Sequence, residues 1–595
     1  MIVTIPARLF ANAELRADQP AYWVRDSSGW RATSWSRYAE EVRTVGRALL
    51  ALDVGVGAKI SILGFNRPEW AICCLAIQSI GGAAAGVYTT NSPEEVAHVV
   101  HHSESPLVVV ENAAQWQKLK VTRARLPLLR WVVLMRGEAP IDDPMVLTWE
   151  QFLGRAADCP KERFDAALAA LDPESLASLI YTSGTTGAPK GVMLSHRNLA
   201  WTARCASDLV NARASDTGLS YLPLSHIAEQ MLSLYLPVVA GASLYFARSI
   251  EKVPEDLKEA QPTLFFGVPR IWEKLHAGIS AKLGEAKGVK KRLADWAMKV
   301  GREVNRRKGS GEPIPDDLLA QYRLADRLVY SKVKRAIGLG KVRVCSSGAA
   351  PIPREILEFL SGLDVVVFEV YGQSEDSGPT TYNRLGKYRL GTVGPAIPGL
   401  ELMIAPDGEV LASGPNVFMG YYKDPAATAQ ALEGGWLHTG DLGEIDRDGF
   451  LSITGRKKDI LITSGGKNIS PKNIEGALAA HAPIAEAVVV GDRRNYLTAL
   501  VTLEPDGAAK LLEAADADPK GPHDHPALLR RVGEIVEEVN RHLARVEQVK
   551  RFRILPRPFT IDAGELTPTL KIKRRVVYER YADEIEAMYA EPADR

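Results

Sequence analysis

The sequence predicts an α/β protein: a large N-terminal domain of parallel sheets covered by helices, followed by a smaller α+β domain. Short apolar runs alternate with amphipathic helical stretches through roughly the first 400 residues, which is the pattern of βαβ units. Turns rich in Gly, Pro and Ser join many of these runs to the helices. Near Gly455 the pattern changes to helix, strand and strand, and the roughly 140 residues that remain suffice for an independent domain.

Each expected strand is a short run of aliphatic and β-branched residues. Such runs occur at 59–63, 106–110 and 131–134 in the N-terminal part, and at 487–490 and 498–503 in the C-terminal part. We therefore predict two domains, 1–455 and 456–595. A final helix is expected to carry Val577, Tyr581, Ile585 and Met588.

A long basic helix is expected between Glu285 and Lys308. Its apolar stripe is predicted to consist of Val289, Leu293, Trp296, Val300 and Val304. Lysines and arginines occupy its other faces. One interpretation is a surface helix that packs on its own domain through the stripe. The other is a peripheral contact of 285–308 with an anionic membrane surface.

Composition excludes several classes of protein. The 595 residues include 73 Lys+Arg and 72 Asp+Glu, so the net charge of +1 gives no overall reason to expect nucleic-acid binding. Five cysteines without metal-ligand spacing favour a reducing, cytoplasmic location. The chain shows neither a signal-peptide pattern nor an apolar run of about 18 residues that could span a membrane. We expect small-molecule partners, and no oligomeric state is predicted.

The run from Tyr181 to Gly191 is the strongest local motif, and it follows the apolar pair Leu179 and Ile180. Its hydroxyl residues and glycines allow backbone amides and hydroxyl groups to converge on an anion, and Lys190 adds positive charge. It is not a Walker A loop, because Pro189 stands where that motif has glycine. The run therefore indicates a polyphosphate site, and the alternative is a plain mobile turn.

This run resembles the phosphate-binding signature of the adenylate-forming (ANL) superfamily of AMP-binding enzymes. Further motifs that resemble those of the superfamily follow in its order and cover almost the whole chain. They are the acyl-pocket motif Tyr221–His226, the adenine-contacting turn Ser347–Pro351, the run Tyr371–Glu375, the ribose motif Thr439–Asp441, the ribose and hinge motif Gly455–Asp459 and the lysine motif Leu566–Arg574.

The resemblance implies a fold and a reaction. The N-terminal domain would contain two parallel-sheet α/β subdomains and a β-barrel-like subdomain, and the small C-terminal domain would be mobile. ATP would convert a carboxylate to an acyl adenylate with release of pyrophosphate. Because this reaction brings a carboxylate up to a negative α-phosphate, we expect catalysis to depend mainly on positioning and charge neutralisation.

The resemblance also implies roles for individual residues. Lys571 would bring a cation to the reacting oxygens, Glu375 would bind Mg²⁺, and His226 would act at the acyl pocket. The expected ATP and phosphate ligands are Thr182, Ser183, Gly184, Thr185, Thr186, Gly187, Lys190 and Ser374, the last in place of the family's usual threonine. The expected adenine and ribose contacts are Ser347, Gly348, Ala349, Tyr371, Gly372, Asp441 and Arg456.

A second step, attack of a thiol on the acyl adenylate, would follow rotation of the small domain. The resemblance places the hinge at Lys458. Rotation would remove Lys571 and bring the loop of Ser464, Gly465 and Gly466 to the thiol tunnel, where glycines permit close passage of the pantetheine arm.

Softer patterns resemble long-chain fatty acyl-CoA synthetases, at 86–91, 267–274 and 463–469. The predicted function is an AMP-forming long-chain fatty acid–CoA ligase that uses ATP, Mg²⁺ and coenzyme A. One alternative is an acyl-AMP ligase that serves a carrier-protein thiol, and another is a ligase for a medium-chain or aryl carboxylate. A luciferase-like oxidation of an adenylate is a remoter alternative. A non-catalytic scaffold is disfavoured, since it would need neither Lys571 nor Glu375 nor Asp441.

Overall fold

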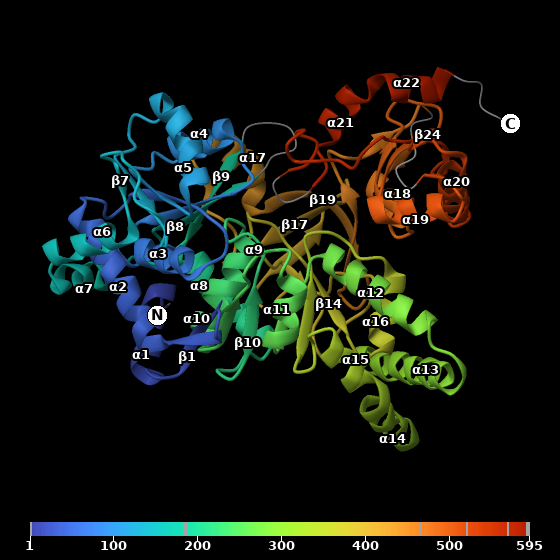
Figure 1. Ribbon diagram of the computed structural model, residues 1–595, viewed down its shortest axis with the longest axis horizontal. Coiled ribbons are helices and arrows are strands. Elements are labelled where there is room, and N and C mark those ends of the chain that lie inside the picture. Colours follow the sequence, from blue (N-terminus) through green and yellow to red (C-terminus); the bar gives the residue numbers. More distant parts are fainter. Residues whose placement is uncertain (1–2, 183–188, 465–466, 519–521, 568–570, 591–595) are drawn as a thin grey trace.

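The computed structural model describes residues 3–182, 189–464, 467–518, 522–567 and 571–590. It confirms the α/β class, although the sheets are mixed because several carry antiparallel strands at their edges. Figure 1 shows the chain from the blue N-terminal helices to the orange and red C-terminal domain at the upper right.

The largest sheet has eight strands in the order β18-β9-β8-β4-β3-β5-β6-β7, with helices on both sides (Figure 1). From β8 to β7 neighbouring strands are parallel, and β9 is antiparallel to both β8 and β18. Every residue of β4 and β5 is buried, as expected for parallel strands covered on both faces. The strands are β3 (Lys59–Leu63), β4 (Ala83–Val87), β5 (Leu107–Val110), β6 (Trp131–Leu134), β7 (Val146–Leu147), β8 (Leu176–Thr182), β9 (Lys190–Ser195) and β18 (Gly420–Tyr421).

Two four-stranded sheets follow a common plan, three parallel strands and one antiparallel edge strand. The order in the first is β10-β11-β1-β2 and in the second β12-β13-β14-β15. The first contains β1 (Pro20–Asp26), β2 (Gly29–Ser34), β10 (Thr217–Ser220) and β11 (Ser243–Phe246). The second contains β12 (Leu264–Phe266), β13 (Val344–Ser347), β14 (Val367–Tyr371) and β15 (Thr381–Tyr382).

An antiparallel sheet, β16-β17-β19-β20, supplies the remaining N-terminal unit, where the resemblance implied a β-barrel-like subdomain. Its strands are β16 (Glu401–Ile404), β17 (Glu409–Ser413), β19 (Leu437–Ile445) and β20 (Leu451–Arg456). The sheet ends at Arg456, the last residue before the segment that leads into the C-terminal part.

The C-terminal part has its own sheet and its own cores. Strands β23 (Ile484–Val490) and β24 (Leu497–Leu503) are antiparallel, and β25 (Val549–Ile554) lies parallel to β24. A two-stranded ladder joins β21 (Leu461–Ile462) to β22 (Asn468–Ile469). The two hydrophobic clusters of this region contain only residues from Leu461 onward, and the division at 455 and 456 remains a prediction.

Helices connect and cover these sheets. Several begin with a side-chain cap, as at α4, where Ser92 and Glu95 form a reciprocal capping box. The N-terminal helices are α1 (Ile5–Leu15), α2 (Trp35–Ala51), α3 (Pro68–Ser79), α4 (Pro93–His102), α5 (Ala113–Thr122), α6 (Trp149–Gly154), α7 (Lys161–Ala169), α8 (His196–Leu209), α9 (Ile227–Gln230), α10 (Leu236–Ala240), α11 (Val253–Ala260), α12 (Pro269–Gly284), α13 (Gly288–Ser310), α14 (Asp316–Ala325), α15 (Ser331–Ala336), α16 (Arg354–Gly362) and α17 (Pro425–Ala431). The C-terminal helices are α18 (Pro471–Ala479), α19 (Pro505–Glu513), α20 (Pro526–Asn540), α21 (Arg574–Arg580) and α22 (Ala582–Ala590). Among the described residues, no helix has both the length and the apolar composition to cross a bilayer.

The basic helix exists as α13, but its buried stripe differs from the predicted one. Val289 is 80% exposed, because it lies in the first turn, beyond the contact with the neighbouring helices α14 and α16. Leu293 and Trp296 are only partly buried. The residues that α13 buries are Ala294, Ala297, Val300, Gly301, Val304 and Asn305.

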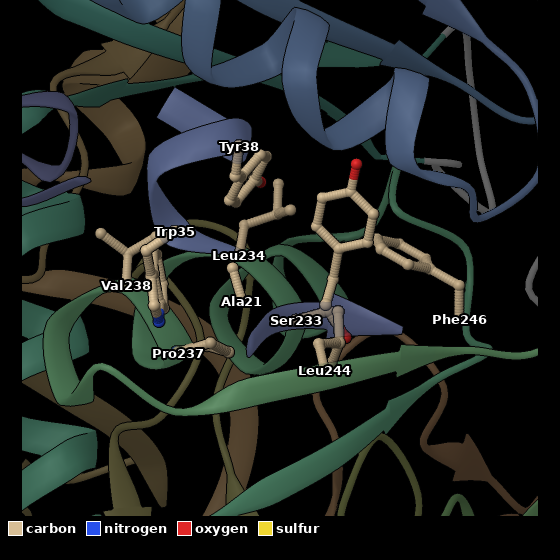
Figure 2. Close-up of a pocket in the computed structure, with 10 residues that line it drawn as sticks. Ala21, Trp35, Tyr38, Ser233, Leu234, Pro237, Val238, Leu244 and Phe246 are labelled. Carbon is tan, nitrogen blue, oxygen red and sulfur yellow. The ribbon is translucent and has the colours of Figure 1, made fainter. Parts of the chain in front are cut away.

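An apolar pocket lies where β1, β11 and α2 meet the π-helix Met231–Tyr235 and α10 (Figure 2). Aromatic and aliphatic side chains such as Trp35 and Phe246 line it. Ser233 at its edge donates a hydrogen bond to Glu229 (2.7 Å). No predicted site residue lines this pocket, so it is separate from the site described next.

Candidate active site

Asp441 is the centre of the site. It lies on β19 directly opposite Arg456 of β20, and only 5% of its surface is exposed. Oδ1 accepts a hydrogen bond from Arg456 Nε (2.7 Å), and Oδ2 accepts from the Tyr371 hydroxyl (2.8 Å) and from Gln373 Nε2 (2.6 Å). Burial and the Asp441 carboxylate raise the pKa of Tyr371 well above its ordinary value, so its hydroxyl remains a donor. The fixed carboxylate has lone pairs left to accept from ligand hydroxyl groups.

Lys571 reaches this centre from the C-terminal part. Its side chain is accessible to water, yet the protein around it is dense enough to disfavour the charged form. Desolvation, followed by the nearby cations Arg456 and Lys472, lowers the pKa of the ammonium to about 8 against the opposing effect of Asp441 and Glu375. Lys571 therefore lies within electrostatic range of both predicted carboxylates.

Two hydrogen bonds join the Lys571 backbone to Thr567. The Thr567 amide donates to the Lys571 carbonyl (2.7 Å), and the Lys571 amide donates to Thr567 Oγ1 (3.0 Å). An ion pair between Lys573 and Glu95 of α4 (3.8 Å) also joins this segment to the N-terminal domain. These contacts hold the segment that carries Lys571 beside the N-terminal domain.

Glu375 is linked to the phosphate motif through Tyr421. The Tyr421 hydroxyl donates to Glu375 Oε1 (2.9 Å), and the Lys190 ammonium lies 4.7 Å from the centre of the Tyr421 ring. Lys190 pairs in register with Thr182, so the two residues flank the phosphate motif at the ends of β8 and β9. The other members of that motif, Ser183, Gly184, Thr185, Thr186 and Gly187, lie outside the described residues.

His226 is a neutral histidine whose ring nitrogen Nδ1 accepts a hydrogen bond. Its Nδ1 accepts from the Ala228 backbone amide (3.2 Å), which leaves the ring proton on Nε2. Burial lowers the pKa of His226 to about 4, and the nearby Lys571 ammonium lowers it as well. At neutral pH the ring can therefore donate to an anionic oxygen and has little capacity to carry a charge.

A buried carboxyl group, that of Glu229, holds the loop that carries His226. Its Oε1 accepts from Ser220, Ser233, the Tyr221 amide and Asn66 Nδ2, at 2.7 to 3.1 Å. Burial outweighs these hydrogen bonds and raises the pKa of Glu229 to about 8. Asn66 in turn donates to the Leu222 carbonyl (2.6 Å), so the loop is held from within the core.

The predicted adenine turn follows β13, whose neighbour β14 ends at Tyr371, so the two motifs lie on adjacent strands. Ala349 has a left-handed backbone, with φ of 72°. Ser347 is 1% exposed, and its hydroxyl makes no hydrogen bond within the described part of the chain. A Cβ atom on Gly348 would lie 2.8 Å from Val370, and one on Gly372 would clash with the Gly378 carbonyl, so glycine is required at both positions. Ser374 of the phosphate set is buried beside Glu375.

The predicted hinge follows an anchored residue. The Lys457 amide donates to the Gly440 carbonyl (2.8 Å), and its ammonium pairs with Asp407 (2.6 Å) and Glu409 (3.1 Å) on the N-terminal side. Lys458 is next and exposed. Ser464 bonds with the 491–495 loop of its own domain, through Asn495 (2.6 Å) and the Arg494 carbonyl, while Gly465 and Gly466 lie outside the described residues.

Sequence reasoning missed Gln373, Tyr421 and Lys472. Gln373 lies inside the Tyr371–Glu375 motif, so its polar side chain could have been noted there. Tyr421 and Lys472 belong to no motif, and their place at the site depends on the packing of distant segments.

The fold, a large N-terminal part and a small C-terminal part that brings Lys571 close to Asp441, is that of the adenylate-forming enzymes. The family model for AMP-binding enzymes matches residues 9–422, and the model for the AMP-binding enzyme C-terminal domain matches 458–593. This chain therefore belongs to the AMP-binding enzyme family.

Relatives in sequence match nearly the whole chain. Long-chain-fatty-acid–CoA ligase ACSBG2 of Xenopus laevis is 37% identical over 99% of this chain and 84% of its own length. The human ACSBG2 ligase is 33% identical over 99% of this chain and 92% of its own length.

Solved structures share the fold at lower identity. The anthranilate CoA ligase AuaEII in complex with anthranoyl-AMP has a TM-score of 0.73 at 22% identity, with 98% of each chain covered. The A-PCP didomain of the carboxylic acid reductase from Segniliparus rugosus, in complex with AMP, has a TM-score of 0.77 at 23% identity, covering 99% of this chain and 82% of that one.

Proposed function

We propose that this protein is an AMP-forming long-chain fatty acid–CoA ligase. The observation that carries the chemistry is the position of Lys571, on the C-terminal part, within electrostatic range of Asp441 and Glu375 on the N-terminal part. The names of the relatives, which match almost the full chain, support the acyl and thiol substrates. All five cysteines are free and four of them are buried, which supports a reducing, cytoplasmic location.

In the first step, a fatty-acid carboxylate oxygen attacks the α-phosphorus of ATP. A new bond forms between this oxygen and the α-phosphorus. The bond from the α-phosphorus to the oxygen that bridges the α- and β-phosphates breaks, and pyrophosphate leaves with the electron pair. Lys571 neutralises charge on the reacting oxygens, and the neutral His226 donates from Nε2 to an anionic oxygen. Asp441 accepts from ribose hydroxyls, with Tyr371 and Arg456 holding it in place. The unpaired Ser347 hydroxyl is available to the base, since a buried polar group without a partner is unfavourable.

Glu375 fits the proposed Mg²⁺ contact. One carboxylate oxygen accepts from Tyr421, and its side chain is only partly buried, so the other oxygen is available to a hard cation. No cluster of three or more metal-ligating side chains occurs among the residues that the structure describes. A single carboxylate suits Mg²⁺, which commonly binds one or two carboxylates together with substrate phosphates and water. When bound, the ion would neutralise phosphate charge.

In the second step, a coenzyme A thiolate attacks the acyl carbon and AMP leaves. The proposed hinge at Lys458, just after the anchored Lys457, supports rotation of 456–595 relative to 1–455. Rotation would withdraw Lys571 and bring the Ser464 loop to the thiol path. Phosphate binding by 182–190 and the adenine contacts at 347–349 are part of the same proposal.

A substrate panel tests this proposal. Purified protein is assayed for pyrophosphate release with fatty acids of several lengths and an aryl acid, with and without coenzyme A. We expect release with long-chain acids and a thioester only when coenzyme A is present. A thioester formed on a carrier protein but never on free coenzyme A would overturn the ligase assignment, and preference for an aryl acid would overturn the acyl class.

We also propose a peripheral membrane contact, confined to the tip formed by the end of α12 and the start of α13. Lys287, Lys290 and Arg292 are exposed there beside the exposed Val289. At the other end of α13, Arg306 and Arg307 are neutralised, because they pair with Glu303 and Glu312. Exposed cations beside an apolar side chain suit an anionic lipid surface.

Flotation with vesicles tests the membrane contact. Wild-type protein should float with vesicles that contain phosphatidylserine, less so as salt increases. The double variant Lys287→Glu and Lys290→Glu should lose this binding, and Arg306→Ala should retain it. Equal binding of all three proteins, or none by the wild type, would favour the interpretation that α13 only packs on its own domain.

A further inference from the structure

Lys472 is a third cation at the site, and the mechanism above does not use it. It is the second residue of α18, and its side chain is exposed. The charged groups that face it are Arg456, Lys571, Asp441, Asp459 and Glu475. Those that face Lys571 are Arg456, Lys472, Asp441, Glu375 and the His226 ring.

The packing of α18 brings Lys472 and Lys571 together. Arg574, three residues after Lys571, forms a two-pronged ion pair with Glu475, three residues and so about one helical turn after Lys472 (2.7 and 2.9 Å). This pair fastens the Lys571 segment to the first turns of α18. At the other side, Ser470 packs so closely on Gly455 that a Cβ there would lie 2.9 Å from Ser470 Oγ. Arg456, the next residue, therefore lies beside the same helix end.

Among the residues that the structure describes, the two lysines have no partners of their own. Arg456 is already bound to Asp441, and Glu475 to Arg574. Within the described ranges, neither the Lys472 nor the Lys571 ammonium forms a hydrogen bond or ion pair. Desolvation, followed by the effect of Arg456, lowers the pKa of Lys472. Neighbouring unpaired cations repel each other, and a polyanion bound between them would relieve this repulsion.

We propose that Lys472 binds the phosphates of the nucleotide together with Lys571, so that the C-terminal domain brings two cations to the adenylation step. The inference rests on the proposed ATP-dependent activity. It assigns Lys472 to the first half-reaction alone, because both lysines belong to the domain that would rotate before thiol attack.

Nucleotide affinity is the first test. The variants are Lys472→Ala, Lys472→Arg and, as a matched control, Lys510→Ala, which removes an exposed lysine from α19 of the same domain. Loss of one charge-assisted contact should raise both the calorimetric Kd for ATP and the KM for ATP by about tenfold to a hundredfold in Lys472→Ala. Lys472→Arg should recover most of the affinity, and thioester formation from supplied acyl adenylate should be unchanged.

The pH profile of adenylation is the second test, and it distinguishes charge from folding. Lys472 lowers the pKa of Lys571, so its removal should move the alkaline limb of kcat/KM to higher pH, whereas Lys510→Ala should leave the limb in place. Unchanged ATP affinity in Lys472→Ala, or an unchanged limb, overturns the proposal. The calorimetric measurement requires no turnover, so it decides about Lys472 even if the wild type fails to activate any fatty acid, a result that would instead overturn the proposed function.

Discussion

At the scale of single residues, substitution of Lys571 is expected to have the largest effect on adenylation. Lys571→Ala should lower adenylation at least a hundredfold, because the ammonium stabilises charge that builds up in the transition state, an effect typically worth several kcal/mol. Thioester formation from supplied acyl adenylate should be nearly normal. Pyrophosphate release and thiolysis, measured separately, check this division. Equal loss in both half-reactions would contradict it.

The pKa of Lys571 predicts the pH dependence of the first half-reaction. The ammonium is needed in its protonated form, which predominates below its pKa of about 8. The kcat/KM for ATP should therefore fall as pH rises through about 8, and kcat should fall at higher pH, since bound phosphates favour the charged lysine. Initial rates of pyrophosphate release from about pH 6.5 to 9.5 test this. A profile that is flat to pH 9.5 would contradict it.

Glu229 should make stability depend on pH. Its folded pKa of about 8 exceeds the ordinary value of 4.5, so between these pH values the native protein holds a proton that the unfolded chain has released. Its contribution to stability is therefore full at acidic pH and is lost as pH rises towards 8, by up to about 1.4 kcal/mol per pH unit. Glu229→Gln cannot titrate, so its urea midpoint should gain on the wild type as pH rises from 5 to 8. A constant difference between the two proteins would show that Glu229 is ionised in the fold.

The sequence predicted much of the site but not its supporting contacts. Asp441, Arg456, Tyr371 and Lys571 each belong to a motif, and the structure brings them together. The amide of Gln373 reaches Asp441 only because of the turn after β14. Glu229 could not be identified as the anchor of its loop, because its partner Asn66 lies more than 150 residues away in the sequence.

At the scale of elements, apolar runs predicted the strands better than the helix faces. Runs 59–63 and 131–134 coincide with β3 and β6, since a strand buried on both faces needs only a continuous apolar stretch. A helix face depends on what lies beside it. The predicted stripe of α13 failed at Val289 because the first turn lies beyond the contacts with α14 and α16, and the predicted final helix is divided at Tyr581 into α21 and α22.

Glycine sets the contact between α13 and α16. A Cβ on Gly301 would lie 2.3 Å from the Gly362 carbonyl oxygen, so Gly301→Ala must push the helices apart. We expect a loss of about 1–3 kcal/mol of unfolding free energy. The control is Gly278→Ala in α12, where a Cβ meets nothing within 4 Å and a gain of up to about 1 kcal/mol is expected. Urea unfolding of both variants measures this, and equal stability would show that the helices adjust freely.

At the scale of the whole molecule, two ion pairs between the N-terminal and C-terminal parts are weak. Lys573 pairs with Glu95, and Arg270 of α12 pairs with Glu504 of the small domain. All four side chains are at least partly exposed, and such pairs typically contribute about 0–1 kcal/mol each. These two ion pairs therefore add little to the stability of the arrangement that presents Lys571.

Restriction of the backbone at Lys458 should impair thioester formation more than adenylation. Among the described residues, the Lys458 amide donates no hydrogen bond, so Lys458→Pro removes no donor from the arrangement seen here, in which Lys571 faces the adenylation site. Proline fixes φ and restricts the preceding residue, which opposes the backbone rotation proposed for thiolation. We expect adenylation within a few-fold of wild type and thioester formation lowered at least tenfold. Lys458→Ala, which removes the same side chain but leaves the backbone free, should retain both steps. If Lys458→Pro forms thioester as fast as Lys458→Ala, the rotation takes place at another residue.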